Sequence, residues 1–212
     1  MTKLYFIRHG ESTANRMGLF VGHTDMDLTE KGHEQAEMTA NYLKDIHIDV
    51  IYSSDLSRAY NTALHTAKLK GMEVIKSKNL REIYGGDWEG QLFDGLCEKY
   101  PEDYSLWLTN AGLATCTNGE SVAGLQKRIT DEVKRIVREN PEKSIAVFTH
   151  ATPIRCLKAE WDKVPADKLK DIPWTTNASI TYAEHDGCEF KITNYSFDEF
   201  MGDMVTALPN NV

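Results

Sequence analysis

Short apolar segments that favour β-strands alternate along the chain with longer segments of helical periodicity. The strand-like segments are residues 3–7, 49–52, 73–75 and 144–148. The helical segments are residues 29–46, 56–70 and 121–140, and a further helix is expected around Pro153. This alternation predicts an α/β fold, a three-layer sandwich with a mostly parallel central sheet. Residues 179–183 and 189–193 predict a terminal hairpin.

Residues 84–118 interrupt the alternation. They contain several glycines and a group of aromatic residues in a partly helical pattern. We expect a lid-like helical insertion above one rim of the sheet, whose aromatic side chains form either a small core of their own or a wall against a ligand. Because 212 residues fit one domain with an insertion, residues 1–212 are predicted to form a single domain.

The composition disfavours several classes of protein. The formal net charge is −8, whereas a protein that coats nucleic acid or an anionic membrane surface needs a cationic face. No apolar run approaches about 18 residues, so no membrane span is expected. The four cysteines are widely separated, and the first apolar run is too short for a secretory signal, so we expect a cytoplasmic protein with reduced thiols. A monomer and a homodimer are both compatible with the sequence.

Polar side chains follow three of the predicted strands at the points where these strands end. They are Arg8-His9 after the first strand, Ser54-Asp55 after the second, with Arg58 close behind, and Thr149-His150 after the fourth. In parallel sheets, ligands bind beyond the carboxyl ends of the strands. We therefore expect two arginines and two histidines to meet at one rim.

Such a set of side chains suits a tetrahedral phosphate dianion. Arg8 and Arg58 can hold it by paired hydrogen bonds, and Arg58 falls in the first turn of a helix, where free N–H groups favour anions. A neutral imidazole can attack phosphorus if its other nitrogen is fixed by a backbone hydrogen bond. Glu82 lies between the third strand and the insertion, from where it can protonate a leaving alkoxide. No GxxxxGK[ST] sequence occurs, so the site is not a P-loop.

These residues belong to a longer series of motifs that resembles the histidine phosphatase superfamily, the phosphoglycerate-mutase-like proteins. The motifs are Arg8-His9-Gly10-Glu11-Ser12 with Asn15, Gly22-His23-Thr24-Asp25, Ser53-Ser54-Asp55-Leu56-Ser57-Arg58-Ala59, Leu80 with Glu82, Trp88-Glu89-Gly90, Gly119-Glu120-Ser121, and Thr149-His150 with Ile154-Arg155. They occur in family-like order and spacing over nearly the whole chain.

The resemblance implies a role for each residue. His9 is expected to be the phosphorylated nucleophile, and Glu82 the proton donor and acceptor. The implied phosphate-binding residues are Arg8, Arg58 and His150, and the implied substrate-binding positions are Asn15, Gly22, Thr24 and Ala151. The resemblance also implies a small phosphorylated metabolite as the binding partner, and no need for a metal or another cofactor.

Two positions depart from the family pattern. Val21 stands where many members have Gln or a small polar residue, and Ala151 stands where glycine is usual. Alanine is tolerated at the second position unless φ there is positive. Both departures bear on substrate contacts more than on phosphoryl transfer.

The insertion favours a phosphatase over a mutase. Mutases that act on phosphoglycerate have a basic insertion. In residues 90–114, by contrast, Lys99 is the only basic residue, and the segment is rich in acidic and aromatic side chains. We therefore expect a phosphatase of the histidine acid type that hydrolyses small phosphomonoesters, with a ring-bearing or apolar leaving group favoured over a polyanionic one. The alternatives are a phosphoglycerate mutase and a non-catalytic phosphate-binding module of the same fold. A metal hydrolase is disfavoured because no HExxH or similar ligand spacing occurs.

Overall fold

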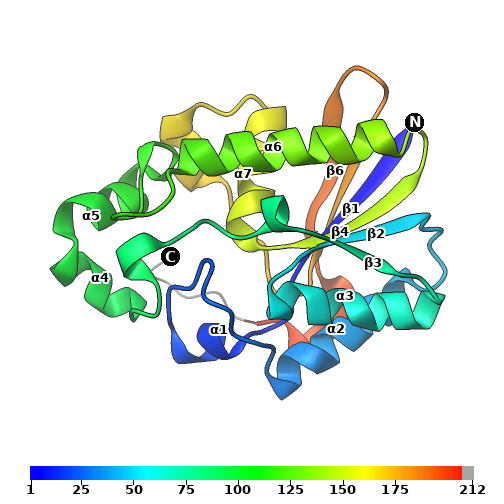
Figure 1. The fold of residues 1–212 in the computed structure, drawn as a ribbon, viewed down its shortest axis with the longest axis horizontal. Helices are drawn as coiled ribbons and strands as arrows, with labels where there is room; N and C mark the ends of the chain where they lie inside the picture. The colour runs from blue at the N-terminus through cyan, green and yellow to red at the C-terminus, as the bar shows by residue number, and fades with distance from the viewer. Residues whose placement is uncertain (207–212) are drawn as a thin grey trace.

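A six-stranded sheet with the order β3-β2-β4-β1-β5-β6 forms the centre of the computed structural model, which describes residues 1–206 (Figure 1). The strands are β1 (Thr2–Arg8), β2 (Val50–Ser54), β3 (Val74–Ser77), β4 (Ser144–Thr149), β5 (Ile180–His185) and β6 (Phe190–Phe197). The first four strands in this order are parallel, and β5 and β6 add an antiparallel edge. The predicted α/β fold with a mostly parallel sheet is confirmed. Residues 207–212 of the predicted domain lie outside the described part.

The central strand β1 supplies side chains to both faces of the sheet. Leu4 and Phe6 join the apolar cluster on one face, and Tyr5 and Ile7 join the cluster on the other. β1 pairs with β4 on one side and with β5 on the other. Because successive side chains of a strand point to opposite faces, this uninterrupted apolar run requires helices on both sides of the sheet.

The helices provide this cover. In Figure 1, α2 (Glu30–Leu43) and α3 (Ser57–Lys70) lie on one side of the sheet, and α6 (Val122–Glu139) and α7 (Ala151–Trp161) lie on the other. Thr29 Oγ1 accepts a hydrogen bond from Gly32 N and caps the start of α2. Gly71, at φ 64°, ends α3 as expected from the sequence. Within residues 1–206, no helix combines the length and apolar character that a membrane crossing needs.

The segment predicted as an insertion contains α4 (Phe93–Lys99) and α5 (Pro101–Thr109), which lie beyond one end of the sheet, on the left in Figure 1. Trp88, Tyr104 and Trp107 are nearly fully buried and belong to the same apolar cluster as the sheet residue Phe6. The aromatic side chains of this segment therefore extend the main core and do not form a separate one.

Short elements complete the chain. They are α1 (Thr13–Met17) and the 3₁₀ turns η1 (Lys78–Leu80), η2 (Gly86–Trp88), η3 (Ala111–Leu113), η4 (Ala166–Asp171) and η5 (Glu199–Met204). Ser12 and Asn15 form a capping box at the start of α1, which fixes the turn directly after β1.

Candidate active site

A cavity lies at the edge of the sheet where three parallel strands end. β1 ends at Arg8, β2 at Ser54 and β4 at Thr149. The predicted site residues that line the cavity are Arg8, His9, Asn15, Arg58, Glu82 and Ala151. The other three, Gly22, Thr24 and His150, are not among its lining residues.

His9 is a buried, neutral imidazole with a defined tautomer. Its Nδ1 lies 2.7 Å from Gly10 O, and because a carbonyl can only accept, Nδ1 carries the proton and donates it. Nε2 then keeps its lone pair. Burial, followed by the charges of Arg58 and Arg8, lowers the pKa of His9 well below its ordinary value. His9 therefore meets the two requirements for an attacking imidazole, a free nitrogen and the neutral state.

The backbone of His9 is held by the turn before β5. The His9 carbonyl accepts hydrogen bonds from Asn177 Nδ2 and Ala178 N, both at 3.1 Å. Ala178 has φ 58°, a left-handed conformation that is uncommon for a residue with a Cβ atom. The surrounding hydrogen bonds maintain this local strain, including the bond from Thr39 Oγ1 to Ala178 O at 2.9 Å.

Arg8 and Arg58 bring two buried guanidinium groups to the cavity. Arg8 is 8% exposed and donates through one terminal nitrogen to Thr175 O, while its Nε has no partner. Burial lowers the pKa of Arg8 to about 10, so the group is still cationic at neutral pH. Arg58 is 1% exposed and donates to Gly22 O at 2.8 Å and to Thr24 O at 3.1 Å.

Gly22 and Thr24 thus hold Arg58 through their carbonyl groups. The carboxylate of Glu89 in turn accepts hydrogen bonds from the backbone N–H groups of Gly22, His23 and Thr24, at 2.8 to 3.1 Å. Burial would raise the pKa of Glu89, but the hydrogen bonds from Thr24, His23 and Gly85 outweigh it and lower the pKa. Glu89 stays ionised and fixes the loop that positions Arg58.

Glu82 is a buried carboxyl group, 9% exposed, on the side of the insertion. Its Oε1 accepts from Ile83 N at 2.8 Å, and its Oε2 accepts from Thr152 N, in the first turn of α7, at 3.2 Å. Burial is the largest effect on its pKa and raises it above the ordinary value. A carboxyl group in this state can serve as a proton donor.

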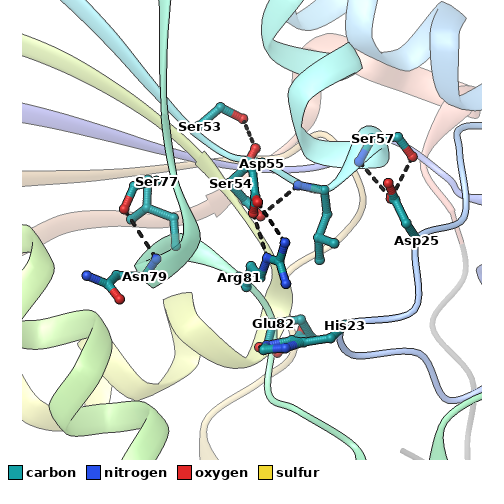
Figure 2. A network of polar contacts seen from close by, with 12 residues as sticks. His23, Asp25, Ser53, Ser54, Asp55, Ser57, Ser77, Asn79, Arg81 and Glu82 are labelled. Atoms are coloured by element: carbon teal, nitrogen blue, oxygen red, sulfur yellow. Dashed lines mark hydrogen bonds and ion pairs between the residues drawn. The ribbon is translucent and has the colours of Figure 1, made fainter.

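The backbone of Glu82 is held by Arg128 and by His23. Glu82 O accepts from Arg128 and from His23 Nε2, both at 3.1 Å, and His23 and Glu82 are both labelled in Figure 2. Next to it, Arg81 donates twice to Asp55, at 2.6 Å each. Asp55 directly follows β2, so this ion pair ties the Glu82 segment to the carboxyl edge of the sheet.

His150 directly precedes the cavity-lining residue Ala151 and is fully buried. Its ring centroid is 5.2 Å from that of His9, and its Nε2 lies 2.9 Å from Ser54 Oγ. Burial lowers the pKa of His150 well below its ordinary value, so the ring is neutral. Ser54 Oγ, which also accepts from Leu56 N at 3.4 Å, can donate to Nε2. Nδ1 of His150 then carries the proton, and it has no partner.

Three donors are therefore buried and unpaired within residues 1–206 at this edge: Arg8 Nε, the Nδ1 of His150 and the hydroxyl of Thr175. An unsatisfied buried donor costs about 1–3 kcal/mol, and an anion in the cavity would relieve that cost. Asn15, whose Oδ1 already accepts from Ser12 and Asn177, offers its amide N–H groups. Unpaired donors of this kind suit an anion.

Ala151 is the first residue of α7 and does not have a positive φ. The departure from glycine is therefore free of backbone strain. Val21 lies on the cavity wall with its apolar side chain. Within the described part of the chain, no three His, Cys, Asp or Glu side chains are grouped as a metal site would need.

A comparison with known protein families establishes the affiliation of the chain. The model of the histidine phosphatase superfamily (branch 1) matches residues 4–198. The chain belongs to the histidine phosphatase superfamily. The match includes every predicted site residue of this superfamily member and the turn before β5.

Individual relatives of this superfamily member are phosphatases. Phosphoserine phosphatase 1 of Hydrogenobacter thermophilus is 38% identical over 157 residues, which cover 74% of each chain. The adenosylcobalamin/alpha-ribazole phosphatase of Escherichia coli is 31% identical over 167 residues, which cover 79% of this chain and 82% of its own. The similarity to these relatives supports the interpretation of this chain as a phosphatase.

Solved structures agree with the fold of this superfamily member. Bacillus stearothermophilus YhfR superposes with a TM-score of 0.91 at 28% identity, over 95% of this chain and 100% of its own. The mycobacterial glucosyl-3-phosphoglycerate phosphatase superposes with a TM-score of 0.84 at 27% identity, over 92% of this chain and 99% of its own.

Proposed function

We propose that this protein is a metal-independent phosphatase that hydrolyses small phosphomonoesters through a phosphohistidine intermediate on His9. The observation that carries the proposal is the state of His9, a neutral ring with Nδ1 fixed on Gly10 O and Nε2 free, beside two buried guanidinium groups. Phosphoryl transfer requires little else than positioning and charge stabilisation.

In the first step, Nε2 of His9 attacks phosphorus and forms a P–N bond while the ester P–O bond breaks. The proton of Glu82 goes to the departing oxygen, and the free alcohol leaves. Arg8, Arg58 and the Nδ1–H group of His150 stabilise the negative charge on the phosphoryl oxygens.

In the second step, the Glu82 carboxylate takes a proton from water, and the resulting hydroxide oxygen attacks phosphorus. The P–N bond breaks, and its electron pair returns to Nε2 of His9. Inorganic phosphate leaves, Glu82 is protonated again, and the enzyme is ready for a further cycle.

The charge of the insertion favours water as the acceptor over a second sugar or acid hydroxyl. Lys99, the only basic residue in 90–114, donates to Gln91 Oε1 and does not line the cavity. A mutase must retain a phosphorylated intermediate with a second anionic group, and among residues 1–206 no cation beyond Arg8 and Arg58 lines the cavity to hold one.

The test of the proposal is to trap the intermediate. The protein is mixed with an excess of a chromogenic aryl phosphate, quenched in alkali within one turnover, and digested for mass spectrometry. We expect a phosphoryl group on the peptide that contains His9, stable in alkali and lost in acid, with or without a chelator present. Steady turnover with no such adduct contradicts the proposal.

Replacing Arg58 by alanine is expected to weaken competitive inhibition by inorganic phosphate about 10- to 100-fold, because charge-assisted hydrogen bonds contribute about 1.5–3 kcal/mol. The measurement is the inhibition constant for phosphate at fixed pH. Arg138→Ala, which removes a cation that is not at the cavity, is the matched control. An unchanged constant in Arg58→Ala would place Arg58 outside the phosphate site.

A further inference from the structure

Four neighbouring aromatic rings line one part of the cavity, whereas His9 and other polar side chains line another part. The ring centroids of Phe93 and Phe20 are 5.6 Å apart, those of Phe20 and Trp107 are 5.8 Å apart, and those of Trp107 and Trp174 are 6.3 Å apart. All four rings line the cavity. We call these four residues the aromatic wall.

The two ends of the aromatic wall are the parts that a ligand can touch. Phe20 is 4% exposed and Trp107 is 5% exposed, so both serve mainly as packing. Phe93 and Trp174 are only half-buried. Each therefore presents ring surface to the cavity, and that surface would leave water when a leaving group covers it.

Trp174 is held in place before any ligand arrives. The guanidinium carbon of Arg155 lies 4.0 Å from the centre of its ring. Arg155 is 4% exposed and donates to the carbonyl groups of Ile172, Leu169 and Lys170, at 2.8 to 3.0 Å. These donors are directed at protein carbonyls, and Arg155 is not among the residues that line the cavity, so Arg155 holds Trp174 in place and does not bind a substrate anion.

The remaining charges of the cavity are already assigned. Its ionisable lining residues, among those the structure describes, are Arg8, His9, Arg58 and Glu82, all of which take part in the proposed phosphoryl transfer. No cation is left for a carboxylate or a second phosphate of the substrate, and no acid is left for an ammonium group. Placing a carboxylate or a second phosphate against the aromatic wall would cost its desolvation without a partner.

We infer that Phe93 and Trp174 determine leaving-group specificity and that they select an uncharged alcohol with a ring directly beyond the ester oxygen. This inference rests on the proposed phosphatase function. It assigns the alcohol side of the substrate to the aromatic wall and the phosphate side to the carboxyl edge of the sheet.

The test compares three primary alkyl phosphates, so that each releases a similar alkoxide. They are 2-phenylethyl phosphate, with an uncharged ring, ethyl phosphate, with neither ring nor charge, and O-phosphoserine, with an ammonium and a carboxylate. We expect kcat/KM for 2-phenylethyl phosphate to exceed the values for the other two about 10-fold or more.

Trp174→Ala and Phe93→Ala should each lower kcat/KM for 2-phenylethyl phosphate about 10-fold through a higher KM, and leave ethyl phosphate within about 2-fold. Trp174→Phe should retain most of the preference. Leu108→Ala, on the exposed side of α5, is the matched control, because Leu108 does not line the cavity.

Two results would overturn the inference and leave the proposed function intact. One is faster turnover of O-phosphoserine than of the ring ester. The other is an equal loss on all three esters in Trp174→Ala, with Trp174→Phe no better, which would make the ring a purely structural residue. If none of the esters and no aryl phosphate is hydrolysed, the proposed function itself fails, and the inference fails with it.

Discussion

Replacing His9 by alanine is expected to lower kcat/KM for any phosphomonoester about 10⁴-fold or more, because the attacking atom is removed and water has no comparable position. The measurement is steady-state hydrolysis of an aryl phosphate and of an alkyl phosphate. The large effect on both esters follows from the first step, since neither can transfer its phosphoryl group without the imidazole.

The variant should still bind phosphate, because Arg8, Arg58 and His150 are unchanged. His47→Ala, which removes an exposed imidazole paired with Asp49, controls for the loss of a histidine as such. Hydrolysis by His9→Ala at the wild-type rate would rule out the nucleophile assignment. A loss of phosphate binding together with turnover would instead mean that the alanine variant is not properly folded.

Glu82→Gln is expected to slow the first turnover of an alkyl phosphate about 10²- to 10⁴-fold and to affect an activated aryl phosphate far less. The reason is that an alkoxide needs a proton to leave, whereas an activated phenolate does not. Rapid-quench measurement of the first turnover separates this step from the later hydrolysis of the phosphohistidine, in which Glu82 acts as a base. Equal losses on both esters would remove the role of proton donor.

The pH dependence of the first turnover is a second test of Glu82 as the proton donor. Burial raises the pKa of Glu82, so the protonated form persists above the usual range for a carboxyl, and the alkyl first turnover declines as the pH rises through that raised pKa. Glu82→Gln should lack this decline.

Burial lowers the pKa of His9, so the ring stays neutral well below pH 6.5, and the loss of rate on the acid side should lie below that value.

Local patterns in the sequence determine most of the fold, and these were predictable. The apolar run of β1 reflects a strand that is buried on both faces, and the periodicity of α6 reflects a helix that is buried on one face. Both patterns can be recognised from residues that are close together in the sequence. Helix ends at Thr29 and Gly71 follow from capping chemistry. The order of the strands, with β4 inserted between β2 and β1, depends on long-range pairing and could not be derived from periodicity.

The candidate site likewise contains some residues that could be predicted from the sequence and others that could not. Arg8, His9 and Arg58 could be placed because strand direction brings their backbone to one edge. The role of Glu89 could not, since its carboxylate binds backbone N–H groups of a loop more than sixty residues away in the sequence, and hydrogen bonds to backbone leave no mark on the partner's residue type. The same holds for Arg155 and for Asn177, which hold carbonyl groups of the 169–172 segment and of His9. The motif Gly22-His23-Thr24-Asp25 was a usable signal, but in the structure Gly22 and Thr24 position Arg58 and do not themselves line the cavity.

Arg8 and His9 stand at the end of the central strand, with hydrogen-bonded neighbours on both sides, whereas Phe93 lies on α4 and Trp174 in a connecting segment. Substitutions that reshape the wall therefore act on parts of the chain that carry no strand pairing, and the reacting groups keep their geometry. A lineage that inherits this arrangement is free to exchange one alcohol for another by small mutational steps, while the phosphorus chemistry passes unaltered from ancestor to descendant.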